Sequence, residues 1–356
     1  MMTPQKIEEF ANNEVVNMYT KLSQELTNEI IKSIKNVGDI SNYTKHQMKV
    51  LIKNGGKYIF SKALLQTQKL TNKRKKEINI LFENLVNEEY KGYDKIYERQ
   101  GKDFTISEEA IQITNGIKTL TNNELKNMTR TIAFSTQKQY VSAMDELYKK
   151  VISGGWSYDK AIKSTLIGLT NNGIILKTKT GNYSLESAVK MNLFTSLKQT
   201  VDGLAYNLQK ELDLKYVWSP PTPYCRPSHR VINGVVMHKD KFEEYRYLTE
   251  EPNCYHTISP VDKEFIPPYT ESELKSINKN ADKVYENRQK QNYYARQVRN
   301  KKKEVVNAKS TPDIQQEKKK QLRNAQIKYR SFSKSVGLDV DYSQTWEAGY
   351  NGNRNW

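Results

Sequence analysis

The chain has 356 residues, enough for two or three domains, but only 37% of them are hydrophobic. Such a polar composition disfavours one large compact core and favours an elongated helical architecture. No run of about 18 apolar residues is present, which excludes a membrane-spanning helix, and two cysteines exclude a disulfide framework. The start of the chain has no apolar signal segment, so we expect a protein made in a reducing cytosol.

Helical periodicity dominates residues 1–212. Apolar residues recur in steps of three and four from Ile7 to Val37, after a Thr3–Pro4 pair typical of a helix start. Glycines at 55 and 56 predict a kink or a break in the second helix, and Thr121 with Glu124 has the form of a capping box that begins a new helix. A short hairpin or an irregular loop is expected at 174–183. The expected helices cover roughly 3–37, 46–66, 73–99, a short segment from Ser107, 121–151, 157–170 and 184–212.

The helical period ends at Leu214, where a small β-rich module begins. Residues 214–219 have the pattern of a strand, and the prolines that follow at 220, 221 and 223 exclude a helix. The stretch 230–238 places two apolar runs around Asn233–Gly234, which predicts a β-hairpin. We therefore expect an α+β module over 213–266.

This module contains both cysteines and three of the four histidines of the chain. Structural zinc is usually held in a tetrahedron of Cys and His ligands, so a metal set of Cys225, His229, Cys254 and His256 is predicted, with His238 as a substitute. The Cys-x-His spacing is not a common zinc-finger spacing. The alternative is that the cysteines are small buried apolar residues and the histidines are hydrogen-bonded core residues.

A catalytic use of the same residues is disfavoured. A metal-dependent nuclease of the HNH or treble-clef type would need further His, Asn or Asp ligands on a helix after the hairpin. The segment that begins at Lys239 offers carboxylates but no histidine, and neither cysteine has the context of a protease nucleophile. We therefore expect no enzyme activity.

The segment 267–338 has the pattern of a basic helical hairpin, followed by a tail at 339–356. From Glu271 to Val340 the chain has 18 Lys or Arg against eight Asp or Glu, a net +10 of the total +17. This charge predicts a polyanionic partner, most simply nucleic acid. Two lysine clusters, one on each arm, are candidates for phosphate contact, with a solvated charged face as the alternative: Lys301, Lys302, Lys303, Lys318, Lys319 and Lys320.

The predicted fold class is thus mainly α. It comprises an elongated helical N-terminal domain, 1–212, with a sub-boundary near residue 150, then the Cys/His module with its β-hairpin, 213–266. The basic helical hairpin, 267–338, and the tail, 339–356, complete the chain.

The order of motifs over residues 150–342 resembles the phage minor capsid protein 2 family, which is related to the Mu F-like head morphogenesis proteins. The matching segments are Cys225-Arg-Pro-Ser-His229, Asn233-Gly-Val-Val236, Asn253-Cys-Tyr-His256, Gln291–Arg299 and Gly337–Tyr342. Two residues depart from the family pattern: Tyr255 stands where Arg is usual, and Cys225 where Ala is frequent.

The resemblance implies a non-enzymatic minor capsid protein of the virion head, made in the host cytoplasm. Such a protein would associate with the portal protein, other capsid proteins and the capsid interior, and would act in head assembly, DNA packaging or DNA delivery (ejection). Packaged double-stranded DNA would be contacted non-specifically, and one structural zinc ion is the only cofactor expected. The alternatives are a metal-dependent nuclease and a general nucleic-acid-binding protein outside a virion.

Overall fold

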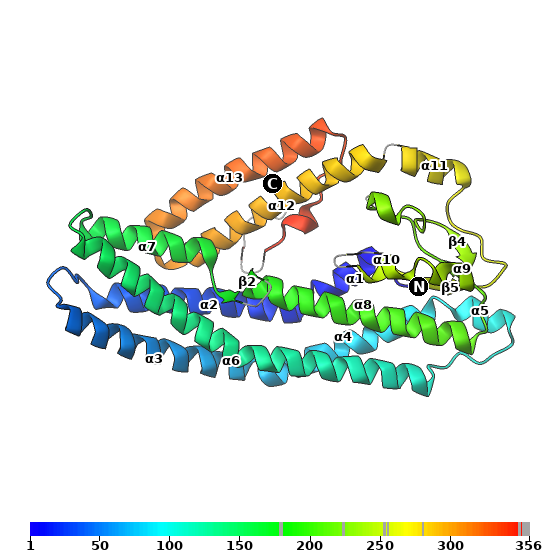
Figure 1. The fold of residues 1–356 in the computed structure, drawn as a ribbon, viewed down its shortest axis with the longest axis horizontal. Helices are drawn as coiled ribbons and strands as arrows, with labels where there is room; N and C mark the ends of the chain where they lie inside the picture. The colour runs from blue at the N-terminus through cyan, green and yellow to red at the C-terminus, as the bar shows by residue number, and fades with distance from the viewer. Residues whose placement is uncertain are drawn as a thin grey trace. The chain divides into compact units, whose positions relative to one another are not determined.

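The computed structural model describes residues 1–177, 181–222, 225–251, 254, 256–279, 281–347 and 350, so the motif residues Asn253 and Tyr255 lie outside it. The chain is mainly α-helical with two small antiparallel sheets, which confirms the predicted fold class (Figure 1). It forms two compact units from interleaved segments. Unit 1 comprises 1–13, 75–123 and 190–290, and unit 2 comprises 14–74, 124–189 and 291–356.

Helices account for most of the chain before the module. They are α1 (Pro4–Ala11), α2 (Glu14–Val37), α3 (Lys45–Lys69), α4 (Thr71–Lys91), α5 (Asp94–Arg99), α6 (Glu108–Ile152), α7 (Tyr158–Asn172) and α8 (Leu185–Glu211). Strands β1 (Ile175–Lys177) and β2 (Asn182–Ser184) form a two-stranded antiparallel sheet, as the hairpin reading of 174–183 predicts.

Short elements make up the module, and longer helices follow it. In chain order they are β3 (Tyr216–Trp218), η1 (Pro227–His229), β4 (Val236–His238), α9 (Lys239–Glu243), α10 (Arg246–Glu250), β5 (Ser259–Val261), α11 (Glu271–Lys279), α12 (Ala281–Asn307), η2 (Ala308–Ser310), α13 (Pro312–Ser335) and η3 (Tyr342–Thr345).

Glycines 55 and 56 do not break α3, so the predicted break was wrong. A Cβ atom at Gly55 would lie 2.0 Å from the hydroxyl oxygen of Tyr140, which reaches α3 from α6. A Cβ atom at Gly56 would lie 3.3 Å from Val141 of the same helix. The glycines therefore allow two helices of unit 2 to approach closely, and this requirement outweighs their low helix propensity.

The capping box predicted at Thr121 is also absent, since α6 runs unbroken through it. The Thr121 hydroxyl donates to the carbonyl of Ile117 at 2.8 Å, and the Asn122 amide donates to the carbonyl of Lys118 at 3.2 Å. Polar side chains that bond back to the preceding turn are compatible with a helix interior. In contrast, the Thr3 cap is confirmed, because its hydroxyl accepts a hydrogen bond from the Lys6 amide.

Tyrosine contributes much of the core of unit 1. Tyr90, Tyr93 and Tyr97 are at most 2% exposed and pack with leucines of α8, namely Leu204 and Leu208. Two of the hydroxyls reach polar partners: Tyr97 donates to Glu211 at 2.5 Å, and Tyr90 lies 3.2 Å from the Ser107 hydroxyl. A thin core is thereby built from rings that keep a hydrogen-bonding group satisfied.

The module, which lies in unit 1, is built on a three-stranded sheet of order β4-β3-β5, with both pairs antiparallel. The predicted 230–238 hairpin is wrong in its pairing, since β4 pairs with β3. Asn233–Gly234 instead forms part of the turn that leads into β4, and Gly234 has a φ of +77°. The small core of the module consists of Val217, Ile232, Phe242 and Leu248.

The hairpin of unit 2 pairs α13 with the part of α12 that begins at residue 291 (Figure 1). Its core consists of Ala295, Val298, Val305, Leu322 and Tyr329. The start of the tail is bound to it. The Gln291 side chain donates to the carbonyl of Asp339 at 2.8 Å, and the Tyr329 hydroxyl donates to the carbonyl of Asp341 at 3.0 Å.

Candidate metal centre

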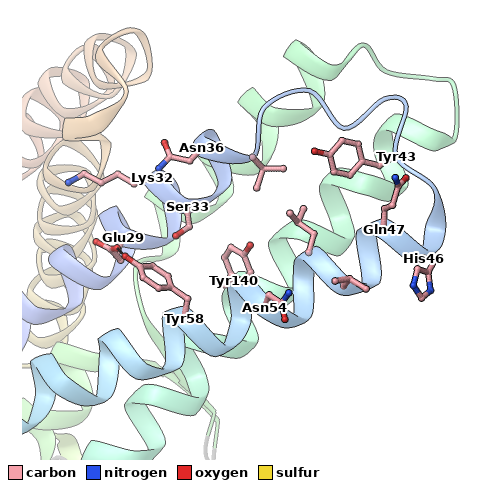
Figure 2. A pocket seen from close by; sticks show the side chains of 14 residues that line it. Glu29, Lys32, Ser33, Asn36, Tyr43, His46, Gln47, Asn54, Tyr58 and Tyr140 are labelled. Atoms are coloured by element: carbon pink, nitrogen blue, oxygen red, sulfur yellow. Dashed lines mark hydrogen bonds between the residues drawn. The ribbon is translucent and has the colours of Figure 1, made fainter.

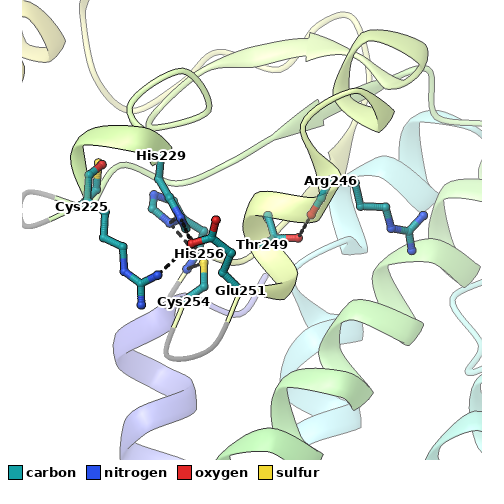
Figure 3. Close-up of polar contacts among 8 residues, drawn as sticks. Cys225, His229, Arg246, Thr249, Glu251, Cys254 and His256 are labelled. Carbon is teal, nitrogen blue, oxygen red and sulfur yellow. Dashed lines mark hydrogen bonds and ion pairs between the residues drawn. The ribbon is translucent and has the colours of Figure 1, made fainter.

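Three of the four predicted ligands meet in the module. The Nδ1 atoms of His229 and His256 lie 3.4 Å apart, and the Cys254 Sγ atom lies 3.5 and 3.6 Å from them. The three side chains are only 1–3% exposed. Figure 3 shows them around one point, with Glu251 beside them.

Short local structures position these side chains. His229 is the last residue of η1, a single turn that begins at Pro227. Cys254 and His256 precede β5, and the His256 amide donates to the Cys254 Sγ atom at 3.4 Å. This backbone contact holds the sulfur and the second imidazole on the same side of the chain.

The outer nitrogens of both imidazoles have oxygen partners. His229 Nε2 lies 3.0 Å from the carboxylate of Glu251, and His256 Nε2 lies 3.3 Å from Asn233 Oδ1. The Thr222 amide donates to the same Asn233 oxygen at 2.7 Å, so this atom is an acceptor and His256 Nε2 carries the proton. Both Nδ1 atoms are therefore left with a lone pair that faces the cluster, the arrangement typical of metal-ligating histidines.

The separations match those of a tetrahedral zinc site. Bonds of about 2.05 Å to nitrogen and 2.3 Å to sulfur at a tetrahedral angle separate two nitrogens by about 3.3 Å, and nitrogen from sulfur by about 3.6 Å. When both imidazoles are neutral, the single thiol proton of Cys254 cannot serve both Nδ1 lone pairs, which lie 3.4 Å apart. The donor set thus fits a borderline-soft cation such as Zn²⁺.

Cys225 does not join this group of ligand atoms, nor does His238. The Cys225 side chain is 5% exposed and donates to the carbonyl of Arg226 at 3.3 Å, apart from the cluster (Figure 3). The exposed His238 caps α9 by accepting a hydrogen bond from the Asp240 amide.

Burial controls the ionisation of the module when no cation is present. It raises the pKa of Cys254, and it raises that of Cys225 to about 11 against the opposing charge of Arg230. Burial also lowers the pKa of His256 to about 4. A metal ion at this place would therefore displace the thiol proton of Cys254 and bind a neutral His256.

The predicted phosphate-contact lysines are mostly occupied by internal partners. Lys302, Lys303 and Lys318 are 4%, 8% and 3% exposed. Lys318 pairs with Glu304 at 3.0 Å, Lys303 pairs with Glu186, and Lys302 donates to the carbonyl of Thr345 at 2.7 Å. Lys301 is half-buried and also pairs with Glu304, while Lys319 and Lys320 are exposed.

These features define a helical protein with a small Cys/His module. Residues 2–334 match the family model described as phage minor capsid protein 2, and the chain belongs to this family. The match includes residues 2–149, which the motif resemblance left out. Comparisons with curated proteins and with solved structures give no match.

Membership of this capsid family implies a place in the virion, with other virion proteins as partners. Over the part of the chain that the structure describes, no helix combines the length and apolar character needed to cross a membrane.

Proposed function

We propose that this minor capsid protein is a non-enzymatic component of the phage head that binds the portal protein and lines the capsid interior. In this role it acts in head assembly, DNA packaging or DNA delivery. The family match over nearly the whole chain supports the role. The mainly helical fold and the deep burial of the only Cys/His cluster found among the described residues are consistent with it.

Within this role, the Cys/His module holds a structural zinc site, called the zinc clasp below, with His229, Cys254 and His256 as ligands. The observation that carries this proposal is the triangle of ligand atoms at 3.4–3.6 Å, with both outer imidazole nitrogens held by oxygen partners. A bound ion would join η1 to the segment before β5. Strands of only three residues and a small core give the module little other stabilisation, so binding energy of this kind would contribute to its folding.

Elemental analysis of protein purified without chelator tests the clasp. We expect about one zinc per chain, retained through gel filtration, because ligands so deeply buried exchange slowly. A stoichiometry well below one would contradict the proposal. Incubation with EDTA under mild denaturation, followed by zinc addition, distinguishes a specific site from surface-bound metal, since only the specific site regains one equivalent.

Purified virions test the head role. Quantitative mass spectrometry of whole particles and of separated heads should find the chain in the head fraction, in far fewer copies than the major capsid protein. Cross-linking should recover peptides joined to the portal protein. Absence from heads would overturn the role.

A plasmid-nicking assay with Mg²⁺, Mn²⁺ and Zn²⁺ tests the non-enzymatic part separately. We expect no cleavage, because the three ligand side chains are almost fully buried, so that a DNA strand could not reach the fourth coordination position of a bound ion. Metal-dependent cleavage that is lost in a His256→Ala variant would favour the nuclease alternative.

A further inference from the structure

Helix α3 carries six lysines and no carboxylate. All six are exposed, and none forms an ion pair with a described side chain: Lys45, Lys49, Lys53, Lys57, Lys62 and Lys69. The first four recur at intervals of four residues, so the charge is spread along the helix and does not appear as a cluster in the sequence. At 1.5 Å per residue, the six lysines extend over about 36 Å, and the first four over about 18 Å.

The surroundings of α3 add little negative charge. The one carboxylate for which a contact with α3 is found is Glu29 of α2, which accepts a hydrogen bond from the Tyr58 hydroxyl at 2.8 Å. Glu29 and the exposed Lys32 line the groove of about 880 Å³ between α2 and α3, together with His46 at the start of α3 (Figure 2). The lining of this groove therefore adds one carboxylate and one ammonium group, and no net negative charge.

The hairpin of unit 2 differs in this respect. Three of its six clustered lysines are buried against internal partners. The exposed cations of α13 (Lys319, Lys320, Arg323, Lys328 and Lys334) share that helix with the exposed acids Asp313 and Glu317. The exposed charged side chains of α13 are thus five cations and two acids, a net +3, whereas those of α3 are six lysines and no acid, a net +6.

We propose that α3 is the surface through which this protein contacts the phosphate backbone of double-stranded DNA, without sequence preference. The inference rests on the proposed function only in taking packaged DNA as the source of the polyanion. Lys45, Lys49, Lys53 and Lys57 follow one another at about 40° steps around the helix and share one side of it over about 18 Å, whereas Lys62 and Lys69 lie on another side. Duplex DNA carries one charge per about 1.7 Å of its axis, so these four lysines can face an equally extended row of phosphates. Lysines supply point charges on flexible stems, which suits phosphate contact more than base recognition.

The same surface would attract an acidic protein segment, but a single segment would cover only part of it. The exposed positions of α3 that are not lysine include Val50, Tyr58 and Leu65, which are separated by about two turns each and form no continuous apolar anchor. Extended, distributed charge with few apolar anchors fits a duplex better than an amphipathic helix.

Two matched variants of the full-length chain test the proposal. The first replaces Lys45, Lys49, Lys53 and Lys57 by Gln. The second replaces Lys319, Lys320, Arg323 and Lys334 by Gln. Each removes four exposed positive charges from unit 2, and Gln is a good helix former, so circular dichroism and thermal melting should match the wild type. Binding is measured by fluorescence anisotropy with a random-sequence 30-base-pair duplex at 50, 100 and 200 mM NaCl.

We expect the α3 variant to bind at least 10-fold more weakly than wild type at 50 mM NaCl. Its salt dependence should fall by a slope of about 3 to 4, since each lost phosphate contact contributes about 0.9. The α13 variant should stay within about 3-fold of wild type. Equal losses in both variants, or a larger loss in the α13 variant, would overturn the assignment to α3.

Absence of duplex binding by the wild-type chain would also overturn the proposal. If that chain instead bound poly-glutamate through α3, the partner would be an acidic protein. Incorporation of the α3 variant into heads is scored separately. An α3 variant that enters heads but fails to bind duplex agrees with both the head role and the α3 surface. A wild-type chain that is absent from heads refutes only the head role.

Discussion

The Cys/His module and the α12–α13 hairpin both contain residues of one chemical kind that cluster in the sequence, but the fold treats them in opposite ways. In the module, two imidazole nitrogens and one sulfur converge at 3.4–3.6 Å, with the outer nitrogens of both imidazoles beside oxygen atoms. In the hairpin, buried lysines meet a carboxylate or a carbonyl of a distant segment. The module therefore gathers groups that could hold a cation, whereas the buried lysines of the hairpin already have partners inside the protein.

The difference teaches that clustering in a sequence indicates which groups lie close together, but not which remain available. Availability depends on partners that come from elsewhere in the chain, such as Glu186 for Lys303 and Thr345 for Lys302. Burying an ammonium group is tolerable only when it is paired and hydrogen-bonded. Lys302, Lys303 and Lys318 thus contribute to the structure of unit 2, and not to an exposed phosphate-binding face.

Removal of a proposed metal ligand should have the largest effect of the changes that test this comparison. We expect Cys254→Ser or His256→Ala to reduce zinc from about one per chain to nearly none and to lower the melting temperature. Apparent binding free energies of structural zinc in small peptides are about 10–16 kcal/mol, much of it folding energy. Differential scanning calorimetry with and without EDTA, paired with elemental analysis, measures both quantities.

Cys225→Ser is the matched control for these ligand variants, because Cys225 is equally buried but lies outside the cluster. It should retain zinc and the EDTA-sensitive shift in melting temperature. Loss of zinc in this variant would make Cys225 a fourth ligand, as the sequence predicts. Identical melting of wild type with and without EDTA would remove the contrast between the two regions.

Loss of the Glu304 carboxylate should have the next largest effect. Glu304 is 6% exposed and pairs with Lys318 at 3.0 Å and with Lys301 at 2.8 Å. Glu304→Gln leaves the Lys318 ammonium buried without its counter-charge, so we expect a loss of about 3–5 kcal/mol in the free energy of unfolding. Urea denaturation followed by circular dichroism measures it.

The exposed Glu317, changed to Gln, controls for the loss of one negative charge and should stay within about 0.5 kcal/mol of wild type. Combining Glu304→Gln with Lys318→Met should restore most of the lost stability, because no unpaired charge is then buried. If Glu304→Gln alone left the free energy of unfolding unchanged, the Lys318 ammonium would not need this pair. The hairpin would then resemble a solvated charged face.

Some features of these regions could be predicted from the sequence and others could not, for physical reasons. Helix existence followed from periodicity, and the ligand residues from their chemistry, because both are local properties. The continuity of α3 and α6 was missed. It depends on the close approach of Tyr140 to Gly55 and on hydrogen bonds from Thr121 to its own helix. The pairing of β4 with β3 was missed because the Asn233–Gly234 signal specifies a turn but not the strand partner.

The polar contacts that orient the imidazoles could not be read from the sequence either. Glu251 lies 22 residues from His229, and its carboxylate also pairs with Arg226 at 2.9 Å. Nothing in the spacing distinguishes it from other exposed acids in the module, such as Glu243 and Glu244. The cationic face of α3 was missed for a related reason, since lysines spaced by four residues do not look like a cluster.

Glu251 gives a smaller test of how complete the metal site is. Glu251→Ala removes the oxygen that holds His229 Nε2, so we expect zinc affinity to fall about 10–100-fold with one zinc still bound at saturation. Glu251→Gln keeps an acceptor oxygen and should lose less. Competition with a chromophoric chelator measures the affinity, and Glu244→Ala removes an exposed carboxylate of the same module as a control. Equal affinities for all variants would show that the histidine is oriented by packing alone.

The smallest expected effect is a pH dependence in the tail that packs on the hairpin. Burial raises the pKa of Glu347 to about 8, and the Glu186 carboxylate acts in the same direction, against the charges of Lys303, Arg299 and Lys302. Its Oε1 atom is enclosed without a hydrogen-bond partner among the described groups. A carboxyl whose folded pKa lies above its unfolded value of 4.5 stabilises the fold when protonated, and this stability is lost as pH rises from about 4.5 to 8.

Glu347→Gln cannot titrate, so it should match wild type at pH 5 and exceed it at pH 8.5. The excess should be of the order of 1–2 kcal/mol after allowance for partial exposure. Melting curves of both proteins at the two pH values measure it, with Glu317→Gln as a variant whose difference from wild type should not change with pH. A constant difference for Glu347→Gln would mean that the carboxyl is solvated. The neutralisation of charge in the hairpin would then stop at Lys302, Lys303 and Lys318 and would not extend into the tail.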